Sequence, residues 1–341
     1  MRNLQREIER ALAAVLSRDP QLAAELQAPA RQGQLSTVAN SLAPALEIFT
    51  DDPQALSEAV ARYRAARPVL NVTRRVLHVV ESNAESETWK KRLEDAGEKV
   101  LRAIDAVGRI EVKGSSEVTI AGTGFMIRDD VMVTSGHVAD YFGEEVEEGR
   151  FDFELTWDDK PMEASVDFLG EVGSATTFTF QVLEVLRMEE DPDLAFLRVA
   201  RESDRKPLPP RLELFTGPLD EVEFVAAIGY PKHEDRPEHE EEMRRIFGNI
   251  FEKKRVSPGV FIGIEDGDVL HDCSVLRGSS GSPVLCLKTG KVVGVHYDGE
   301  FLEGGFAVSV GATEALLEDT IPETRDDRLG LVALAAADEP R

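Results

Sequence analysis

Apolar residues near the N-terminus recur at intervals of three and four, which places them on one face of an amphipathic helix. The first such run comprises Leu4, Ile8, Ala11, Leu12 and Val15. Three further runs follow, one after Asp19, one after Ser36 and Thr37, and one after Asp52. Asp19 and Asp52 each precede a proline, as a helix cap precedes the first helical position. Because one short helix cannot bury its apolar face alone, the pattern predicts a compact bundle of four helices over about residues 1–68. We take residues 1–70 as an N-terminal helical domain.

Residues 71–106 connect this region to the rest of the chain. The apolar positions within residues 71–81 fit either a helix or a strand. Residues 84–106 have helical spacing again, and Trp89 and Leu93 share one face. The pattern therefore predicts a helical connector over residues 71–106.

From Arg109 onward apolar residues recur at every second position, which predicts β-strands with one buried face. Glycine usage changes near the same boundary, since 25 of the 26 glycines lie beyond residue 96. The strand runs cover residues 110–112, 118–120, 125–127, 131–134, 151–155, 164–168, 177–186, 195–199, 222–228, 260–264, 284–287 and 292–295. Many short strands with turns between them predict an antiparallel double β-barrel over residues 107–322, followed by a tail at 323–341. The predicted fold class is α+β, with a small helical bundle ahead of the two barrels.

The net charge of −25 lies entirely outside the N-terminal domain, because residues 1–70 hold eight basic and eight acidic side chains. Phosphate groups would be repelled by such a surface, so we expect neither a nucleic-acid partner nor an anionic membrane. The acidic surface serves solubility or steers a basic partner toward the protein.

The 341 residues include only two cysteines, Cys273 and Cys286. Scarcity of cysteine is typical of reducing compartments, although one bridge between the two stays open. The first seven residues carry charges where a secretory leader is apolar, and no apolar run approaches the length of a membrane span. We therefore expect a cytoplasmic protein.

A serine-rich turn, RGSSGSP at residues 277–283, stands directly before the apolar run 284–287. A serine hydroxyl acts as a nucleophile only beside a base and with N–H donors that hold the oxyanion. The flanking glycines permit a tight turn and close approach of a carbonyl to Ser280. His137 follows one strand run, and Asp193 precedes another. Each feature alone fits an ordinary loop, but the three together indicate a catalytic serine.

The order His, Asp, Ser and the run GTGF at residues 122–125 resemble the trypsin-like (chymotrypsin-fold) serine endopeptidases. The resemblance implies that Ser280 is the nucleophile, His137 the general base and Asp193 the carboxylate that orients it. It also implies that the N–H groups of Gly278 and Ser280 form the oxyanion hole.

Two positions depart from the usual pattern of that family. Ser279 stands where zymogens of the family have an aspartate that binds a freed N-terminus, so that activation switch is not expected. Control is then expected from the N-terminal helical domain. Gly136 precedes His137 where many relatives have a larger residue, which predicts a looser turn.

The run VVGVHY at residues 292–297 resembles the Gly-x-His strand of the glutamyl endopeptidases. By that resemblance His296 lines a pocket for an acidic side chain. The same resemblance implies that Tyr297, Asp298 and Gly299 form the edge that pairs with the substrate backbone.

Those relatives carry a hydroxyl residue five positions before the nucleophile, where this chain has Val275, with Ser274 one step earlier. Ser274 and Val275 are therefore candidate pocket residues, but the set of polar side chains that would surround an acidic substrate side chain is incomplete. A small or apolar preference is an equal alternative to an acidic one, and a buried structural role for His296 stays open.

Two runs rich in histidine and glutamate, residues 233–235 and 239–242, offer groups that bind metals. They lack HExxH spacing, and Pro237 interrupts any helix through them. A solvated acidic loop is favoured, and we expect no metal and no other cofactor.

The whole arrangement is similar to bacterial trypsin-like proteases of defence and signalling systems, which carry N-terminal effector-associated helical domains. The similarity implies a serine endopeptidase that cuts an intracellular protein substrate. It also implies recruitment by a partner through like-with-like association of helical domains. The alternative is a catalytically silent scaffold with a protease fold that binds peptides without cutting them.

Overall fold

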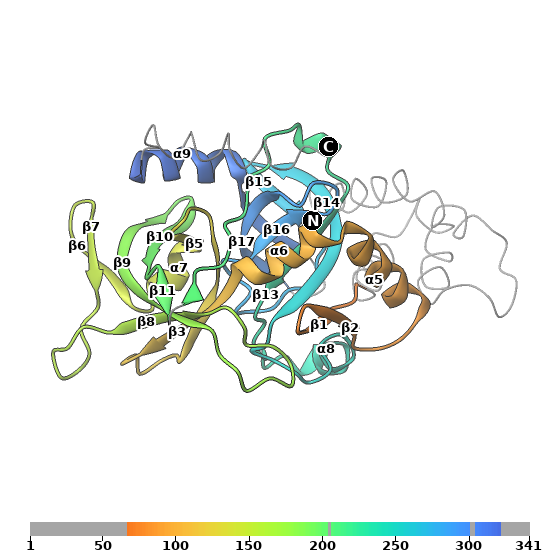
Figure 1. Cartoon of the computed structure of the whole chain (residues 1–341), viewed down its shortest axis with the longest axis horizontal. Coiled ribbons are helices and arrows are strands. Elements are labelled where there is room, and N and C mark those ends of the chain that lie inside the picture. The colour runs from red at the N-terminus through yellow and green to blue at the C-terminus, as the bar shows by residue number, and fades with distance from the viewer. Residues whose placement is uncertain (1–66, 204–205, 301–303, 322–341) are drawn as a thin grey trace, which may run out of the picture.

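The computed structural model describes residues 67–203, 206–300 and 304–321. The helical bundle predicted over residues 1–68 lies outside these residues except for its last two positions, and the predicted tail at 323–341 lies wholly outside them. The described part of the chain contains two six-stranded antiparallel barrels (Figure 1), so the predicted double β-barrel is confirmed.

Six strands close the first barrel, in the order β10, β5, β4, β3, β8 and β9. Along β3 the buried Ile110 and Val112 alternate with the partly exposed Arg109 and Glu111, which is the two-residue period of a strand with one buried face. The strands are β3 (Val107–Lys113), β4 (Ile120–Met126), β5 (Val131–Thr134), β8 (Glu163–Asp167), β9 (Thr179–Glu190) and β10 (Asp193–Val199).

The second barrel closes because β13 pairs with both β14 and β16. The ring continues from β16 through β17, β18 and β15 back to β14. Its strands are β13 (Phe224–Gly229), β14 (Arg255–Glu265), β15 (Asp268–His271), β16 (Pro283–Cys286), β17 (Val292–Glu300) and β18 (Gly304–Ser309).

The residues that precede the first barrel pack on the second one. The strands β1 (Leu70–Thr73) and β2 (Val76–Val79) form a hairpin that extends the second sheet, with Leu70 opposite Val256 of β14. The connector predicted over residues 71–106 is therefore helical only from residue 84 onward. The hairpin forms because alternate residues, Leu70 and Val72, are buried against the barrel while their neighbours are partly exposed.

Two helices then lead into the first barrel. The helix α5 (Ala84–Ala96) begins at Asn83, whose side chain accepts a hydrogen bond from the Ser86 N–H at 2.9 Å. It ends at Gly97, which has a φ of 59°. The helix α6 (Glu98–Ala106) follows at once and runs directly into β3.

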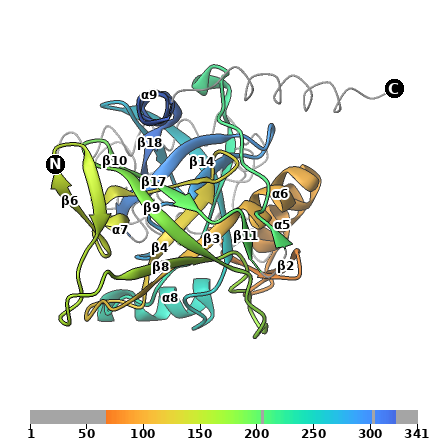
Figure 2. The same cartoon turned by 60° about the vertical axis from the view of Figure 1, so that its left-hand side comes forward.

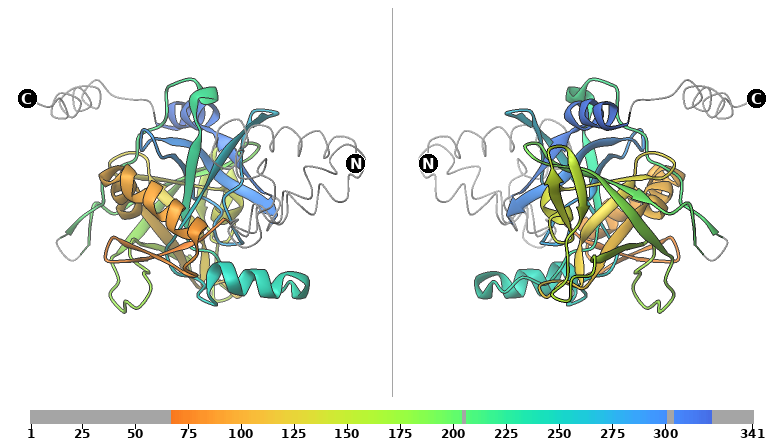
Figure 3. Two further views of the ribbon diagram at one scale, coloured as in Figure 1. Left: turned by 90° about the vertical axis from the view of Figure 1, so that its right-hand side faces the viewer. Right: turned by 90° about the vertical axis from the view of Figure 1, so that its left-hand side faces the viewer.

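The remaining described elements are short. The helices α8 and α9 lie on opposite sides of the molecule (Figures 1 and 3), and β6 and β7 form a hairpin at the outer end of the first barrel (Figures 1 and 2). These elements are α7 (Gly136–Ala139), α8 (Glu240–Phe247), α9 (Val310–Thr320), β6 (Gly143–Glu147), β7 (Arg150–Phe153), β11 (Glu202–Ser203), β12 (Lys206–Pro207) and the 3₁₀ turns η1 (Leu219–Glu221) and η2 (Pro237–His239).

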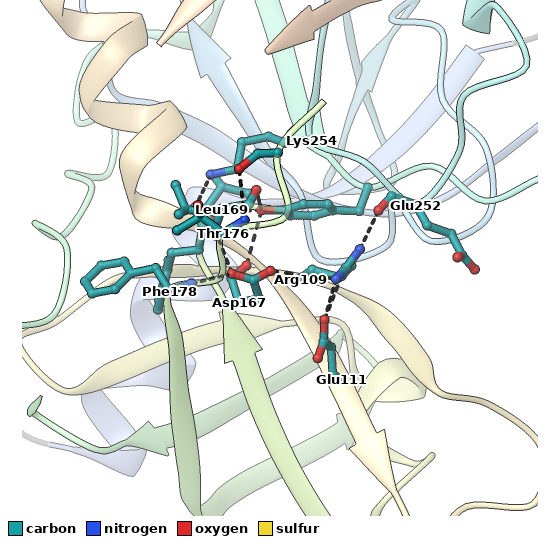
Figure 4. A network of polar contacts seen from close by, with 12 residues as sticks. Arg109, Glu111, Asp167, Leu169, Thr176, Phe178, Glu252 and Lys254 are labelled. Carbon is teal, nitrogen blue, oxygen red and sulfur yellow. Dashed lines mark hydrogen bonds and ion pairs between the residues drawn. The ribbon is translucent and has the colours of Figure 1, made fainter. Parts of the chain in front are cut away.

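A partly buried polar network joins the two barrels (Figure 4). The Arg109 guanidinium on β3 donates to the Glu252 carbonyl at 2.6 Å. The Lys254 ammonium, next to β14, donates at 2.6 Å to the carbonyls of Ile104 in α6 and of Phe168 in the first barrel. Burial lowers the pKa of Lys254 to about 8. Because buried donors that lose their acceptors are costly, these bonds hold the barrels in one relative orientation and so shape the cleft between them.

Both cysteines are free thiols buried in the second barrel, so no bridge joins Cys273 and Cys286 in this structure. Within the part of the chain that the structure describes, no helix is both long enough and apolar enough to cross a bilayer.

Candidate active site

Two paired strands of the first barrel bring His137 and Asp193 together. His137 lies in α7, immediately after β5, and Asp193 begins β10, which pairs with β5 at Ala195 opposite Thr134. One carboxylate oxygen, Oδ2, lies 2.6 Å from His137 Nδ1, and the other accepts the His137 backbone N–H at 2.9 Å. The carboxylate therefore fixes both the ring and the backbone of the histidine.

Gly136 makes this arrangement possible. A Cβ at this position would stand 2.3 Å from the Glu189 carbonyl oxygen and 2.9 Å from Asp193 Oδ1. Both distances are too short for any side chain, so the looser turn expected from the sequence is instead a close-packed one. Glycine is needed here because the strand β9 and the carboxylate both approach the backbone.

Opposing effects determine the protonation of His137. Burial favours the neutral imidazole, whereas the hydrogen bond and the charge of Asp193, and then the charges of Asp140 and Asp298, favour the imidazolium. The carboxylates prevail, and the pKa of His137 is raised above its usual value of 6.5.

Ser280 lies on the turn between β15 and β16 of the second barrel. The first barrel holds this turn through Thr123 of β4, whose N–H donates to the Ser280 carbonyl at 2.9 Å and whose hydroxyl donates to the Gly278 carbonyl at 2.7 Å. Gly281 has a φ of 87°, and a Cβ there would stand 1.9 Å from the Thr123 carbonyl oxygen. The turn therefore requires glycine both for its conformation and for its contact with the other barrel.

Hydrogen bonds around Arg277 determine the direction of the next peptide group. The Arg277 carbonyl accepts from the Lys232 N–H at 2.6 Å, and the Arg277 N–H donates to Glu234 Oε1 at 2.6 Å. Because a peptide is planar and trans, its C=O and N–H point in opposite directions. The Gly278 N–H consequently points away from Lys232.

The same reasoning applies to the two following peptides. The Ser279 N–H donates to the Leu276 carbonyl at 3.0 Å, and the Ser279 carbonyl accepts from the Ser282 N–H at 2.9 Å. No hydrogen bond among the described residues uses the N–H of Gly278 or Ser280, and both residues line a cavity of about 700 Å³. Two unpaired donors close to a serine hydroxyl are what an oxyanion hole requires.

This cavity contains the residues that the sequence singled out for chemistry. His137, Asp193, Gly278 and Ser280 all line it. The Ser280 hydroxyl donates to the Tyr297 carbonyl at 3.2 Å. No hydrogen bond between this hydroxyl and the His137 ring occurs among the described residues, and in proteins without substrate such bonds are commonly long.

The residues predicted to bind substrate divide into two groups. Tyr297 and Asp298 line the cavity. The β16 ladder on β17 ends at Val295, while the β18 ladder continues to Glu300. On the β16 side, residues 297–299, which include Gly299, therefore have no strand partner in the described part of the chain and could accept an added strand.

The other predicted pocket residues are buried and do not line the cavity. His296 is 3 % exposed, its Nδ1 lies 3.3 Å from Nε2 of the buried His271, and burial lowers the pKa of His296 to about 4. Val275 is buried, and the Ser274 hydroxyl donates to the Arg67 carbonyl at 3.0 Å. The imidazole of His296 is therefore neutral at neutral pH.

Two residues near the serine turn were not expected from the sequence. Glu234, interpreted as part of a solvated acidic loop, is 8 % exposed and accepts the Arg277 N–H. Arg67, the first described residue, is 2 % exposed and pairs with Asp272 at 2.8 Å. Neither has a local sequence signal, because the partner is 43 residues away in one case and 205 in the other. No group of three or more metal-binding side chains was found among the described residues.

Comparisons with known proteins agree with this geometry. Residues 122–295, just over half of the chain, match the family described as trypsin-like peptidase domain. A probable serine protease of Lysobacter enzymogenes is 25% identical over 258 residues, which cover 66% of this chain and 65% of that protein. The chain therefore spans slightly less than two thirds of the length of this relative.

Two solved structures show weaker similarity. A serine endoprotease from Yersinia pestis has 18% identity and a TM-score of 0.45, covering 67% of each chain. A protease from M. tuberculosis in its active form has 19% identity and a TM-score of 0.43, covering 66% of this chain and 85% of the other. Taken with the two barrels and the cavity between them, the family match shows that this chain belongs to the trypsin-like peptidase family.

Proposed function

We propose that this chain is a serine endopeptidase that hydrolyses peptide bonds in an intracellular protein substrate. Ser280 is the nucleophile, His137 the general base and Asp193 its orienting carboxylate. The observation that best supports this role is the 2.6 Å contact between His137 Nδ1 and Asp193 Oδ2, at a cavity that Ser280 also lines. The two unpaired N–H groups of Gly278 and Ser280 provide the remaining part of the machinery.

The chemistry follows from the direction of each group. Asp193 accepts the hydrogen of Nδ1, so the neutral ring has its lone pair on Nε2. Nε2 takes the proton of the Ser280 hydroxyl while the serine oxygen attacks the substrate carbonyl carbon, and the N–H groups stabilise the oxyanion. His137 then protonates the leaving amine as the C–N bond breaks. A water repeats the sequence on the acyl-serine, releases the carboxylic acid and returns the proton to Ser280. No step requires a metal or another cofactor.

The substrate backbone pairs with residues 297–299, the part of β17 that β16 leaves uncovered. His296, Ser274 and Val275 form the layer behind the primary pocket. His296 is buried and neutral, and a neutral ring offers no charge to a carboxylate. This supports a small or apolar side chain, and not an acidic one, on the substrate residue just before the cleaved bond. A peptide library digested by the full-length chain tests this preference, and cleavage restricted to Glu and Asp positions would overturn it.

The N-terminal domain recruits or regulates the protease by like-with-like association with the helical domain of a partner, in a cytoplasmic bacterial defence or signalling system. The balanced charge of residues 1–70 supports a protein partner there. Two full-length copies with different tags should co-purify, or each should capture a partner with such a domain. Deletion of residues 1–66 should abolish the capture, and reaction of Ser280 with an active-site probe should show that the remaining chain is folded. Capture that survives the deletion would refute this role.

A fluorophosphonate probe tests the enzyme against the alternative of a silent peptide-binding scaffold. The probe should label the full-length chain, and Ser280→Ala should abolish the labelling. Ser279→Ala is the matched control, because it removes a neighbouring hydroxyl and should leave the labelling unchanged. Peptide binding without any labelling, in the presence of candidate partners, would favour the scaffold.

A further inference from the structure

Arg67, the first described residue, is buried against the loop that leads to the serine turn. The Arg67 guanidinium donates through Nε and Nη2 to Asp272 Oδ2, at 2.9 and 2.8 Å. It also lies over the ring of Trp89, 4.9 Å from the ring centroid, and 3.6 Å from a carboxylate oxygen of Glu85. A guanidinium with these partners is held in one position.

The backbone carbonyl of Arg67 makes a second contact with the loop before Ser280. The Ser274 hydroxyl donates to the Arg67 carbonyl at 3.0 Å. The other carboxylate oxygen of Asp272 accepts the Val260 N–H of β14 at 2.6 Å. Asp272 and Ser274 are therefore fixed between the second barrel and Arg67.

Apolar packing continues this contact toward the serine. Val69 is fully buried in a cluster with Leu276 and with α8 residues such as Phe247. Leu276 in turn accepts the Ser279 N–H at 3.0 Å. We call residues 67–69 the anchor segment and residues 272–282 the nucleophile loop.

The nucleophile loop depends on such contacts because it contains no strand. β15 ends at His271, and β16 begins at Pro283. A loop without a continuous ladder keeps one conformation through separate hydrogen bonds and packing contacts, so each of them matters more. If Arg67 moved away, Asp272 would be a buried carboxylate without its charge partner, and the loop would relax toward solvent.

We infer that Arg67 is a positioning residue, whose anchor segment holds the nucleophile loop in the form that presents Ser280 and the N–H of Gly278. This inference rests on the proposed peptidase function. Arg67 does not line the cavity, so it acts through the loop and not on the substrate. Since Arg67 directly follows residue 66 in the chain, a displacement of the chain at that point would reach the nucleophile loop through this contact.

The test uses the full-length chain and the variants Arg67→Met, Arg67→Lys and Ser274→Ala. Arg128→Met is the matched control, because Arg128 pairs with Glu318 of α9, away from the nucleophile loop. For each variant kcat and KM on a peptide ester, the rate of fluorophosphonate labelling and Tm are measured. Hydrogen exchange over residues 276–282 is recorded in parallel.

Arg67→Met should lower kcat and the labelling rate by about tenfold to a hundredfold at a temperature where it is folded, with KM changed less than about threefold. Exchange over residues 276–282 should rise. Arg67→Lys should recover part of kcat, Ser274→Ala should show a smaller loss, and Arg128→Met should lower Tm while kcat stays unchanged. If Arg67→Met does not fold, Arg67→Lys and Ser274→Ala decide the question.

An unchanged kcat with unchanged exchange in the folded Arg67 variants would overturn the inference, and so would an equal loss of kcat in Arg128→Met. Failure of the proposed function looks different, since the unaltered chain would then be neither active nor labelled. Hydrogen exchange still tests the anchor in that case, and unchanged protection of residues 276–282 in the Arg67 variants would refute it.

Discussion

At the residue scale, the two peptide groups on either side of the Arg277 Cα are each held by a hydrogen bond. Glu234 accepts the Arg277 N–H, and the Lys232 N–H donates to the Arg277 carbonyl, each at 2.6 Å. The Glu234 carboxylate is itself 2.7 Å from the Arg236 guanidinium. This pair of bonds, and not the glycine alone, determines that the Gly278 N–H is available to an oxyanion.

Glu234→Ala should lower kcat by about tenfold with little change in KM, because it frees the Leu276–Arg277 peptide, and the adjoining Arg277–Gly278 peptide is then less firmly oriented. Glu234→Gln keeps an acceptor oxygen and should lose much less. Steady-state kinetics on a peptide substrate, together with the affinity of a peptide boronate that mimics the tetrahedral intermediate, measure the effect. Equal losses in the two variants would indicate that the charge, and not the acceptor, is what matters.

The raised pKa of His137 predicts the pH dependence of the reaction. The base must be neutral to accept a proton, so kcat/KM should rise with pH through a midpoint above 6.5, the usual value for histidine. Asp140→Asn removes one of the charges that raise this pKa and should move the midpoint of the pH profile to lower pH. Glu144→Gln is the control, because Glu144 lines the same acidic cavity but is not one of the charges that raise this pKa.

The raised pKa of His137 also affects stability, which should fall with rising pH where kcat/KM rises. Because the folded pKa of His137 is raised, its contact with Asp193 contributes to the free energy of unfolding fully below pH 6.5. That contribution is lost as the pH rises through the folded value. For the activity profile, a kcat/KM midpoint that does not move in Asp140→Asn, or that moves to higher pH, would contradict this assignment of charges.

At the scale of elements, β4 of the first barrel supports the serine turn of the second. Thr123 is completely buried, and its hydroxyl donates to the Gly278 carbonyl at 2.7 Å and accepts the Tyr230 N–H at 3.1 Å. Its own carbonyl accepts the Thr134 hydroxyl of β5 at 2.6 Å. One strand therefore connects the strand that precedes His137 to the turn that holds Ser280.

Thr123→Val keeps the shape of the side chain but removes the hydroxyl, which leaves the Gly278 carbonyl and the Tyr230 N–H without this partner. We expect a loss of about 1–3 kcal/mol in the free energy of unfolding. Urea denaturation followed by fluorescence measures it, and kcat should fall as well because the turn loosens. Thr123→Ser restores the hydroxyl and should recover most of the stability; equal stability of Thr123→Val and the unaltered chain would refute the argument.

At the scale of the whole molecule, the net charge is −25, and acidic side chains gather on one side of the active site. A second cavity of about 790 Å³ adjoins His137 and is lined by six acidic residues besides Asp193: Asp140, Glu144, Glu145, Glu154, Glu189 and Glu190. The cavity that Ser280 lines has two cationic side chains, Lys232 and Arg277, beside the carboxylates of Asp193 and Asp298. The cleft is thus strongly acidic toward the first barrel and carries its cationic side chains near the nucleophile loop.

This polarity predicts salt-sensitive cleavage of peptides that are basic on the side of the acidic cavity. Raising the ionic strength from about 10 mM to about 150 mM shortens the screening length from ~30 to ~8 Å. For such a peptide kcat/KM should fall by about threefold to tenfold, mainly through KM. A neutral peptide of the same length is the control, and the double substitution Glu144→Gln and Glu145→Gln should reduce the salt dependence.

Local pattern was sufficient for much of this protein. Strand alternation from Arg109 onward predicted the two barrels, because a one-sided buried strand has a period of two whatever it pairs with. The serine turn was recognisable because RGSSGSP combines a nucleophile with glycines that few other turns need. The order of His137, Asp193 and Ser280 then identified the family, which the family match and the fold support.

Tertiary structure decided the features whose partners are far away in the chain. Residues 70–79 became a hairpin because β14 offered an edge, which no local spacing reveals. His296 became a neutral interior residue beside His271, and Glu234 a buried acceptor for Arg277. The physical reason is the same in each case. Periodicity and turn chemistry act over a few residues, whereas burial and the pairing of charged or polar groups depend on whichever distant segment the fold brings alongside.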